Sequence, residues 1–412
     1  MAKKKNNDKI KPCWFAWIIY MIVSKIIIAF KTKTKINKKV FKERNKNEGC
    51  ILLYNHTSKM DHFLTTSAFG FTRVSYVIST HFLFKSKIRI LLNMVRAIPK
   101  EQFKSDIGTI KKIKRAIQCK LPVAIAPVGQ ITMHGDSLNM DKSIVKLLKM
   151  CNVDVYAITL HGSYFAFPKW HIFKRKNPIT VNFEKLFSKE DLKQLSEDEL
   201  YDNIYQTLDI VDRREVDKYK YNLKPKNLIV GIEDMLYKCP NCLENDKLIT
   251  KDNVITCSKC GNSLLMNCRG KFESNSINSK IFDNEADWYN WEKSIIKDSV
   301  DNGTLYLEGN FDMYHNINKD YNLIKMGFGK VVLTNNELYY IGMFNGENKK
   351  IDFKLSSLKQ LPFETRNHFA IPSDEGTYEF KPSNGELNSK IAQFVQTIDV
   401  LANCRKESED HE

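Results

Sequence analysis

The chain has 412 residues, 42% of them hydrophobic, which suits two or three globular units and excludes a single small domain. Its formal net charge of +16 predicts attraction to an anionic partner, either nucleic acid or an anionic membrane surface. Of the ten cysteines, four form two CxxC pairs and six show no framework spacing, which favours a reducing compartment over a disulfide scaffold.

A hydrophobic run from Pro12 to Phe30 lies between two lysine-rich flanks near the N-terminus. As a helix it reaches about 28 Å, close to the thickness of the hydrocarbon core. Lys25 lies inside the run, and a charge at the bilayer centre costs about 3 kcal/mol. We therefore expect residues 1–40 to form a membrane anchor, interfacial or re-entrant rather than spanning, with the protein associated with the cytoplasmic face of a membrane. A buried hydrophobic helix is the alternative. No cleavage site for a secretory signal follows.

Residues 41–220 alternate short apolar runs with helical periodicity, which predicts an α/β domain with a mixed sheet flanked by helices. Strands are predicted at 50–55, 74–79, 121–127, 153–160 and 178–183. Helices are predicted at 58–69, 81–93, 105–118 and 139–150, and a capped helix at SEDELYDNIYQTLDIVD.

The segment YNHTSKMD, residues 54–61, allows two interpretations. Ser58 and Asp61 have the spacing of a capping box that begins a helix. His56 and Asp61 also have the spacing of a base and its carboxylate, in which the carboxylate holds the far ring nitrogen and makes the near one more basic. The HxxxxD pattern alone is weak, and a structural histidine is the better interpretation of it in isolation.

Residues 237–270 contain two CxxC pairs separated by fourteen residues, a spacing typical of a zinc ribbon. Four thiolates complete a tetrahedral site and leave no position open for substrate, so we expect a structural Zn²⁺. Chance or redox use of the pairs is the alternative. The expected ligands are Cys239, Cys242, Cys257 and Cys260.

A linker helix is predicted within 271–300, and residues 301–412 change to period-two alternation with turn residues. The segment GKVVLTNNELYYIG at 329–342 and an amphipathic helix at 387–403 resemble the GRAM and pleckstrin-homology type of β-rich domain. That resemblance implies lipid-headgroup or protein binding, and a scaffold without a ligand is equally compatible.

Four segments follow one another in residues 50–170. They are NHTSKMD at 55–61, RAIPKEQ at 96–102, APVGQIT at 126–132 and ITLHGSYFAFPKW at 158–170. In this order they resemble the four sequence boxes of the glycerolipid acyltransferases, the family of the lysophosphatidic acid acyltransferases, whose first box is N-H-x-x-x-x-D.

The resemblance implies that His56 deprotonates an acceptor hydroxyl, that Asp61 orients His56, and that the hydroxyl attacks the thioester of acyl-CoA or acyl carrier protein. The implied acceptor is lysophosphatidic acid or a related lysophospholipid at a membrane surface. Backbone N–H groups at the start of the helix are candidate donors to the oxyanion. The expected substrate-binding residues are Asn55, Arg96, Lys100, Pro127, Gly129 and Gln130.

Three departures from the family pattern remove charged groups that normally help to bind the acceptor's phosphate. Val128 and Ile131 replace the Glu and Arg of the third box, and Gln102 replaces the Arg of the second. Lys104, His134 and Asp136 are nearby candidates for compensation. The alternative function is a catalytically impaired lipid-binding adaptor. Nucleic-acid binding is a distant third, because the ribbon lacks a dense basic and aromatic face.

Overall fold

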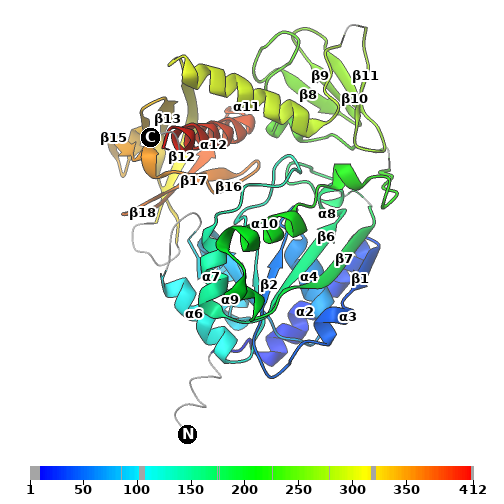
Figure 1. The fold of residues 1–412 in the computed structure, drawn as a ribbon. Helices are drawn as coiled ribbons and strands as arrows, with labels where there is room; N and C mark the ends of the chain where they lie inside the picture. Colours follow the sequence, from blue (N-terminus) through cyan, green and yellow to red (C-terminus); the bar gives the residue numbers. More distant parts are fainter. Residues whose placement is uncertain are drawn as a thin grey trace. The chain divides into compact units, whose positions relative to one another are not determined.

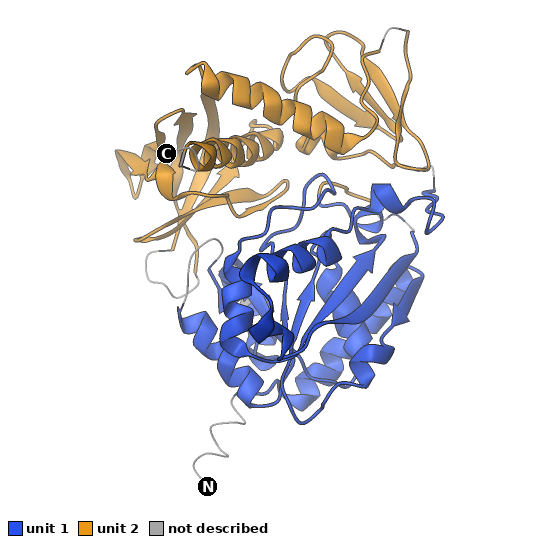
Figure 2. Cartoon of the chain, viewed as in Figure 1, with its two compact units in different colours: residues 1–169, 174–224 blue, residues 170–173, 225–412 orange. Residues whose placement is uncertain are grey.

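The protein folds into two compact units, which are described separately (Figure 2). Unit 1 comprises Met1–Lys169 and Lys174–Lys224, and unit 2 comprises Trp170–Phe173 and Pro225–Glu412. The computed structural model describes residues 10–84, 86–101, 107–173, 175, 177–224, 226–277, 279–316 and 322–409.

Unit 1 is built on a seven-stranded mixed sheet with the order β1-β7-β6-β2-β5-β3-β4 (Figure 1). Strands β6, β2, β5, β3 and β4 run parallel to one another, and β7 pairs antiparallel with β6. This confirms the predicted α/β class with a mixed sheet. The strands are β1 (Thr34–Asn37), β2 (Ile51–Tyr54), β3 (Ser75–Ser79), β4 (Ile98–Lys100), β5 (Val123–Ile125), β6 (Val155–His161) and β7 (Ile179–Phe187).

Both faces of this sheet are covered, because its central strands are buried at every position and side chains alternate between the faces. Ile51 and Leu53 of β2 pack with α6 (Ile107–Gln118), α7 (Ser143–Cys151) and α10 (Glu197–Leu208). Leu52 and Tyr54 pack on the other face with α2 (Trp14–Lys31), α3 (Lys39–Lys42) and α4 (Asp61–Phe69). The shorter helices are η1 (Thr80–Phe84), α5 (Ser86–Met94), α8 (Ser163–Ala166), α9 (Asp191–Gln194) and η2 (Asp212–Glu215).

Several predicted boundaries differ from the observed ones. The helix expected from residue 58 begins at Asp61, and the one expected at 81–93 is η1 followed by α5. The strand expected at 121–127 is shortened to Val123–Ile125, because the backbone after Ala126 turns, with the Gly129 N–H donating to the Ala126 carbonyl. The capped helix is confirmed, since Ser196 and Glu199 form a reciprocal capping box at the start of α10.

Helix α2 has one buried face and one exposed apolar face. Trp17 is fully buried, and its indole N–H donates to the carbonyl of Gly70 at the end of α4 (3.0 Å). Trp14, Ile22, Ile26 and Phe30 are exposed. One face of the hydrophobic run is therefore part of the core of unit 1, and the other is not covered by the described residues.

Unit 2 contains two antiparallel sheets and two long helices (Figure 1). The first sheet is formed by β8 (Leu248–Lys251), β9 (Val254–Cys257), β10 (Ser263–Met266) and β11 (Phe272–Ser274). The second has the order β15-β14-β13-β12-β18-β17-β16 and contains β12 (Tyr306–His315), β13 (Ile324–Thr334), β14 (Leu338–Phe344), β15 (Glu347–Phe353), β16 (Phe363–Glu364), β17 (His368–Ser373) and β18 (Gly376–Pro382). The helices are α11 (Glu285–Asp301) and α12 (Ser389–Glu409).

Helix α12 closes the core of the second sheet. Its Phe394 packs against Phe311 of β12 and Phe369 of β17, with ring centroids 5.5 and 5.1 Å apart. Seven antiparallel strands followed by a helix have the element order expected for residues 301–412. The GRAM or pleckstrin-homology identity stays a prediction.

Candidate active site

His56 lies in the loop between β2 and α4, at the carboxyl end of the central strand of unit 1. Its Nδ1 is 2.9 Å from Oδ2 of Asp61, the first residue of α4. The carboxylate can only accept, so Nδ1 carries a proton, and in the neutral ring Nε2 then has a free lone pair. The His56 side chain is 23% exposed, and no other described residue forms a hydrogen bond with its Nε2. A neutral imidazole in this tautomer can take a proton from a bound hydroxyl.

Asp61 is fully buried, and both carboxylate oxygens are surrounded by donors. Besides the His56 ring, Oδ2 accepts from the backbone N–H groups of Thr57 (2.8 Å) and Ser58 (2.9 Å). Oδ1 accepts from the hydroxyls of Ser58 (2.7 Å) and Ser163 (2.6 Å). Five donors fix the orientation of the carboxylate. The amides of Thr57 and Ser58 are thus already engaged, although the start of this helix was expected to offer donors to an oxyanion.

The capping interpretation of Ser58 is half correct. The Ser58 backbone N–H donates to Asp61, as in a capping box, but the Ser58 hydroxyl also donates to Asp61 instead of accepting from its amide. The hydroxyl accepts from the Met60 N–H (3.1 Å). Ser58 therefore mainly positions the carboxylate of Asp61 and contributes less to capping the helix.

Ser163 was not among the predicted site residues. It is fully buried at the start of α8, directly after β6. Strands β2 and β6 are parallel neighbours, so their carboxyl ends meet at one edge of the sheet and Ser163 reaches the loop that carries His56. The sequence shows that a serine follows a predicted strand. It does not show that this strand pairs with β2, which is what brings Ser163 to Asp61.

The short helix that carries Ser163 is held by a second buried carboxylate, Asp212. It accepts from the N–H groups of Gly162 (2.6 Å) and Phe165 (3.0 Å), and burial raises its pKa to about 6. The loop that positions Ser163 is thus anchored to the segment after α10.

Asn55 joins β2 to β6 with its side-chain amide. It donates to the Leu160 carbonyl (3.0 Å) and accepts from the Leu160 N–H (2.8 Å), so both of its polar ends are engaged by the backbone of the neighbouring strand. This arrangement fixes the end of β2 beside His56, and it occupies both the oxygen and the nitrogen of the Asn55 amide. Asn55 therefore orients the loop, although the resemblance suggested contact with substrate.

A pocket that is open to solvent lies against His56. Tyr54, Asn55 and Thr57 form its wall on the β2 side. The opposite walls come from the third box, the loop before α7 and the end of α10, and they consist of Pro127, Val128, Thr132, Asp136, Ser137, Leu138, Met140, Tyr205, Leu208 and Asp209.

The third box is attached by its backbone to the loop that carries His56. The Thr132 N–H donates to the His56 carbonyl (3.4 Å), and Gly129 adopts φ +74°, a conformation that favours glycine. Pro127 lines the pocket, whereas Gly129 and Gln130 do not. These two residues shape the turn that brings Pro127 and Val128 to the wall.

The residues predicted from the second box are not brought to the pocket. Arg96 has φ +52° in the turn before β4, at the amino end of that strand, opposite the edge where His56 lies. Lys100 ends β4 on the edge of the sheet, three strands from β2 and so about 14 Å away across the sheet. Its Nζ donates to the Glu101 carbonyl (3.1 Å). Gln102 and Lys104 fall outside the described residues.

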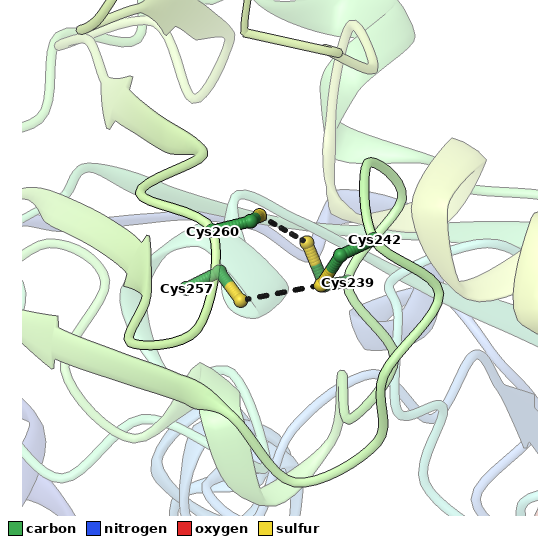
Figure 3. A group of neighbouring side chains, drawn as sticks. All are labelled: Cys239, Cys242, Cys257 and Cys260. Carbon is green, nitrogen blue, oxygen red and sulfur yellow. Dashed lines mark hydrogen bonds between the residues drawn. The ribbon is translucent and has the colours of Figure 1, made fainter.

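The four cysteines of the two CxxC pairs meet as their spacing predicts (Figure 3). Their Sγ atoms all lie within 4.8 Å of one another. Cys239 and Cys260 are 3.6 Å apart at sulfur, and Cys242 and Cys257 are 3.7 Å apart. A tetrahedral Zn²⁺ with bonds of about 2.3 Å sets its sulfurs about 3.8 Å apart, so this donor set fits such an ion.

Residues 30–161 match the family model described as Acyltransferase. This stretch holds His56, Asp61 and most of the pocket wall. Among solved structures, one match is the 1-acyl-sn-glycerophosphate (LPA) acyltransferase PlsC from Thermotoga maritima, with 14% identity and a TM-score of 0.42 over 50% of this chain and 79% of that one. No curated protein matches the sequence.

Proposed function

Because residues 30–161 match the Acyltransferase model, we propose that the protein is a membrane-associated O-acyltransferase. It moves a fatty acyl group from acyl-CoA or acyl carrier protein to the hydroxyl of a lysophospholipid or a related lipid acceptor. One observation carries this proposal: His56, held by a buried carboxylate, presents a free ring nitrogen beside an open pocket.

In this reaction Nε2 of His56 takes the proton of the acceptor hydroxyl as the oxygen attacks the carbonyl carbon of the thioester. Asp61 stabilises the imidazolium that forms, because its charge lies next to Nδ1. When the tetrahedral intermediate collapses, the C–S bond breaks, and the thiolate takes the proton from Nε2 as it leaves. The products are an ester and a free thiol, and the histidine returns to its neutral form.

The exposed face of α2 supports the membrane association. Trp14 is 61% exposed and Phe30 82%, and α2 is the one described helix that is long and apolar enough to cross a membrane. Because its other face is packed in unit 1, we assign it an interfacial position in which the exposed side chains enter the acyl layer. Lys31, at the end of α2, has its Nζ 3.7 Å from Sδ of Met60, next to Asp61. The apolar face thus ends near the edge of the sheet that carries His56. We place the protein on the cytoplasmic side of the membrane, because its cysteine composition favours a reducing compartment.

The same proposal includes a structural zinc ion held by Cys239, Cys242, Cys257 and Cys260. Their sulfur geometry supports it, and a four-thiolate set leaves no coordination position for substrate. The ion would hold two loops of unit 2 together and take no part in acyl transfer.

The test of the function is acyl transfer by the purified full chain, reconstituted in phospholipid vesicles with labelled oleoyl-CoA or oleoyl carrier protein and a panel of lysolipids. His56→Ala and His56→Gln should each lower kcat by about 10³-fold, the usual contribution of a general base. Gln is the matched variant, since it can still donate to Asp61 but has no basic nitrogen. Thermal unfolding of both should stay close to that of wild type. Equal rates of thiol release and product formation in wild type and variants would contradict the proposal and favour the adaptor function.

A further inference from the structure

The charge of the pocket contrasts with the charge of the whole chain. The chain carries +16, but none of the described residues that line the pocket is a lysine or an arginine. Two lining residues, Asp136 and Asp209, are carboxylates. Val128, Leu138 and Met140 give the remaining wall a largely apolar character. The site beside His56 thus offers no cation to a bound phosphate from this part of the chain.

Both carboxylates are paired with arginines that do not line the pocket. Arg213 forms an ion pair with Asp136 and also donates to the His134 carbonyl (2.7 Å), and its side chain is 13% exposed. Arg214 is 2.8 Å from Asp209. The guanidinium groups are therefore used in neutralising the pocket wall. A phosphate monoester would have to displace one of these pairs or lie against the carboxylates, and both cost free energy.

We propose that the pocket accepts a hydroxyl carried on an uncharged head, of the monoacylglycerol type, and discriminates against an acceptor with a phosphate monoester next to its hydroxyl. This inference rests on the proposed acyltransferase function and identifies the class of its acceptor. The wall matches such a head, because ion-paired carboxylates leave oxygen acceptors for its second hydroxyl and the apolar residues cover its carbon backbone.

The test compares 1-oleoylglycerol with 1-oleoylglycerol 3-phosphate in phosphatidylcholine vesicles. The surface of these vesicles is neutral, so the host lipid adds no charge that would attract the positively charged chain. Binding is followed by the imidazole NMR signal of His56 in the ¹³C-histidine-labelled full chain, assigned by its loss in His56→Ala. Acyl transfer from oleoyl-CoA is measured in parallel. Wild type should bind the uncharged lipid at least tenfold more tightly.

Three variants make the result specific to the pocket. Asp209→Asn removes a negative charge from the wall and releases Arg214, and Ser137→Lys adds a cation at a small, partly exposed position, so each should shift the preference about tenfold toward the phosphate lipid. Asp198→Asn is the matched control, because this exposed carboxylate on α10 pairs with Lys142 outside the pocket and should leave the preference unchanged.

The outcomes separate the two proposals. Equal or tighter binding of the phosphate lipid by wild type, or binding of neither lipid, overturns the inference about the acceptor. His56-dependent transfer to the phosphate lipid alone overturns it too, while the acyltransferase function stands. Preferential binding of 1-oleoylglycerol without any His56-dependent transfer supports the pocket assignment and counts against the enzymatic function.

Discussion

Each unit of the protein buries a carboxylate completely, and the two carboxylates have different surroundings. Asp61 in unit 1 accepts five hydrogen bonds, one of them from an imidazole that faces an open pocket. Glu292 in unit 2 accepts from the backbone N–H groups of Tyr237 (2.7 Å) and Lys238 (2.8 Å) and from the amide of Gln396 (3.1 Å). None of its donors is titratable.

Burial of a carboxylate alone therefore does not mark an active site in this protein. Glu292 fastens the segment before Cys239 to α11, and the indole of Trp288 on the same helix donates to the Lys238 carbonyl (2.9 Å). Asp61 also fastens a loop, but one of its donors is a base that can exchange a proton with a ligand. We infer that Glu292 has a structural role and Asp61 a chemical one.

The largest effect is expected at the proposed zinc site, whose first CxxC segment is held by Glu292. Cys257→Ser should lose the zinc ion, because three thiolates and a hydroxyl bind it far more weakly, and the free energy of binding contributes directly to folding. Metal analysis should find one zinc per wild-type chain and much less in the variant, and proteolysis should cleave residues 237–264 of the variant faster. Acyl transfer should change by less than about twofold if the ion is structural. Unchanged zinc content would refute the assignment.

A smaller but specific effect is expected at Asp61. Asp61→Asn keeps the size of the side chain and removes the charge that stabilises the imidazolium, so kcat should fall by about 10²-fold or more. Ser163→Ala removes one of the five donors and should cost less than about tenfold, because the other four still orient the carboxylate. If Ser163→Ala lowers kcat as much as Asp61→Asn, or if Glu292→Gln does so, the division between a chemical and a structural carboxylate is wrong.

The sequence predicts local features of this fold well, and it misses what depends on strand order. Features that depend only on residues close in the chain could be predicted from the sequence. These are the apolar runs, the spacing of His56 and Asp61, and the spacing of the four cysteines. Ser163 meets Asp61 only because β6 pairs with β2, about a hundred positions away in the chain. The prediction for Arg96 depended on strand direction in the same way. Arg96 lies before the amino end of β4, and His56 lies at the opposite edge of the sheet, where the parallel strands end.

The smallest effect concerns the pH dependence of unit 2. Burial raises the pKa of Glu292 to about 8, against 4.5 for an exposed glutamate. The folded state therefore holds a proton that the unfolded state releases, and the stability from this group is complete below pH 4.5 and is lost as the pH rises through about 8. Glu292→Gln has no such proton to lose, and its amide can still accept from Tyr237 and Lys238.

The difference between wild type and variant isolates this group from the others that titrate. Between pH 6 and pH 9 the Tm of wild type should fall by about 5 °C more than that of Glu292→Gln, since about 1 kcal/mol shifts Tm by about 2–4 °C in a unit of this size. Hydrogen exchange at the amides of Tyr237 and Lys238 should accelerate with pH beyond its intrinsic dependence only in wild type. Glu347→Gln, which changes an exposed glutamate of β15, should follow wild type. If the Tm of wild type and of Glu292→Gln changed with pH in the same way, Glu292 would not hold an extra proton in the folded state. The contrast between Asp61 and Glu292 would then be wrong.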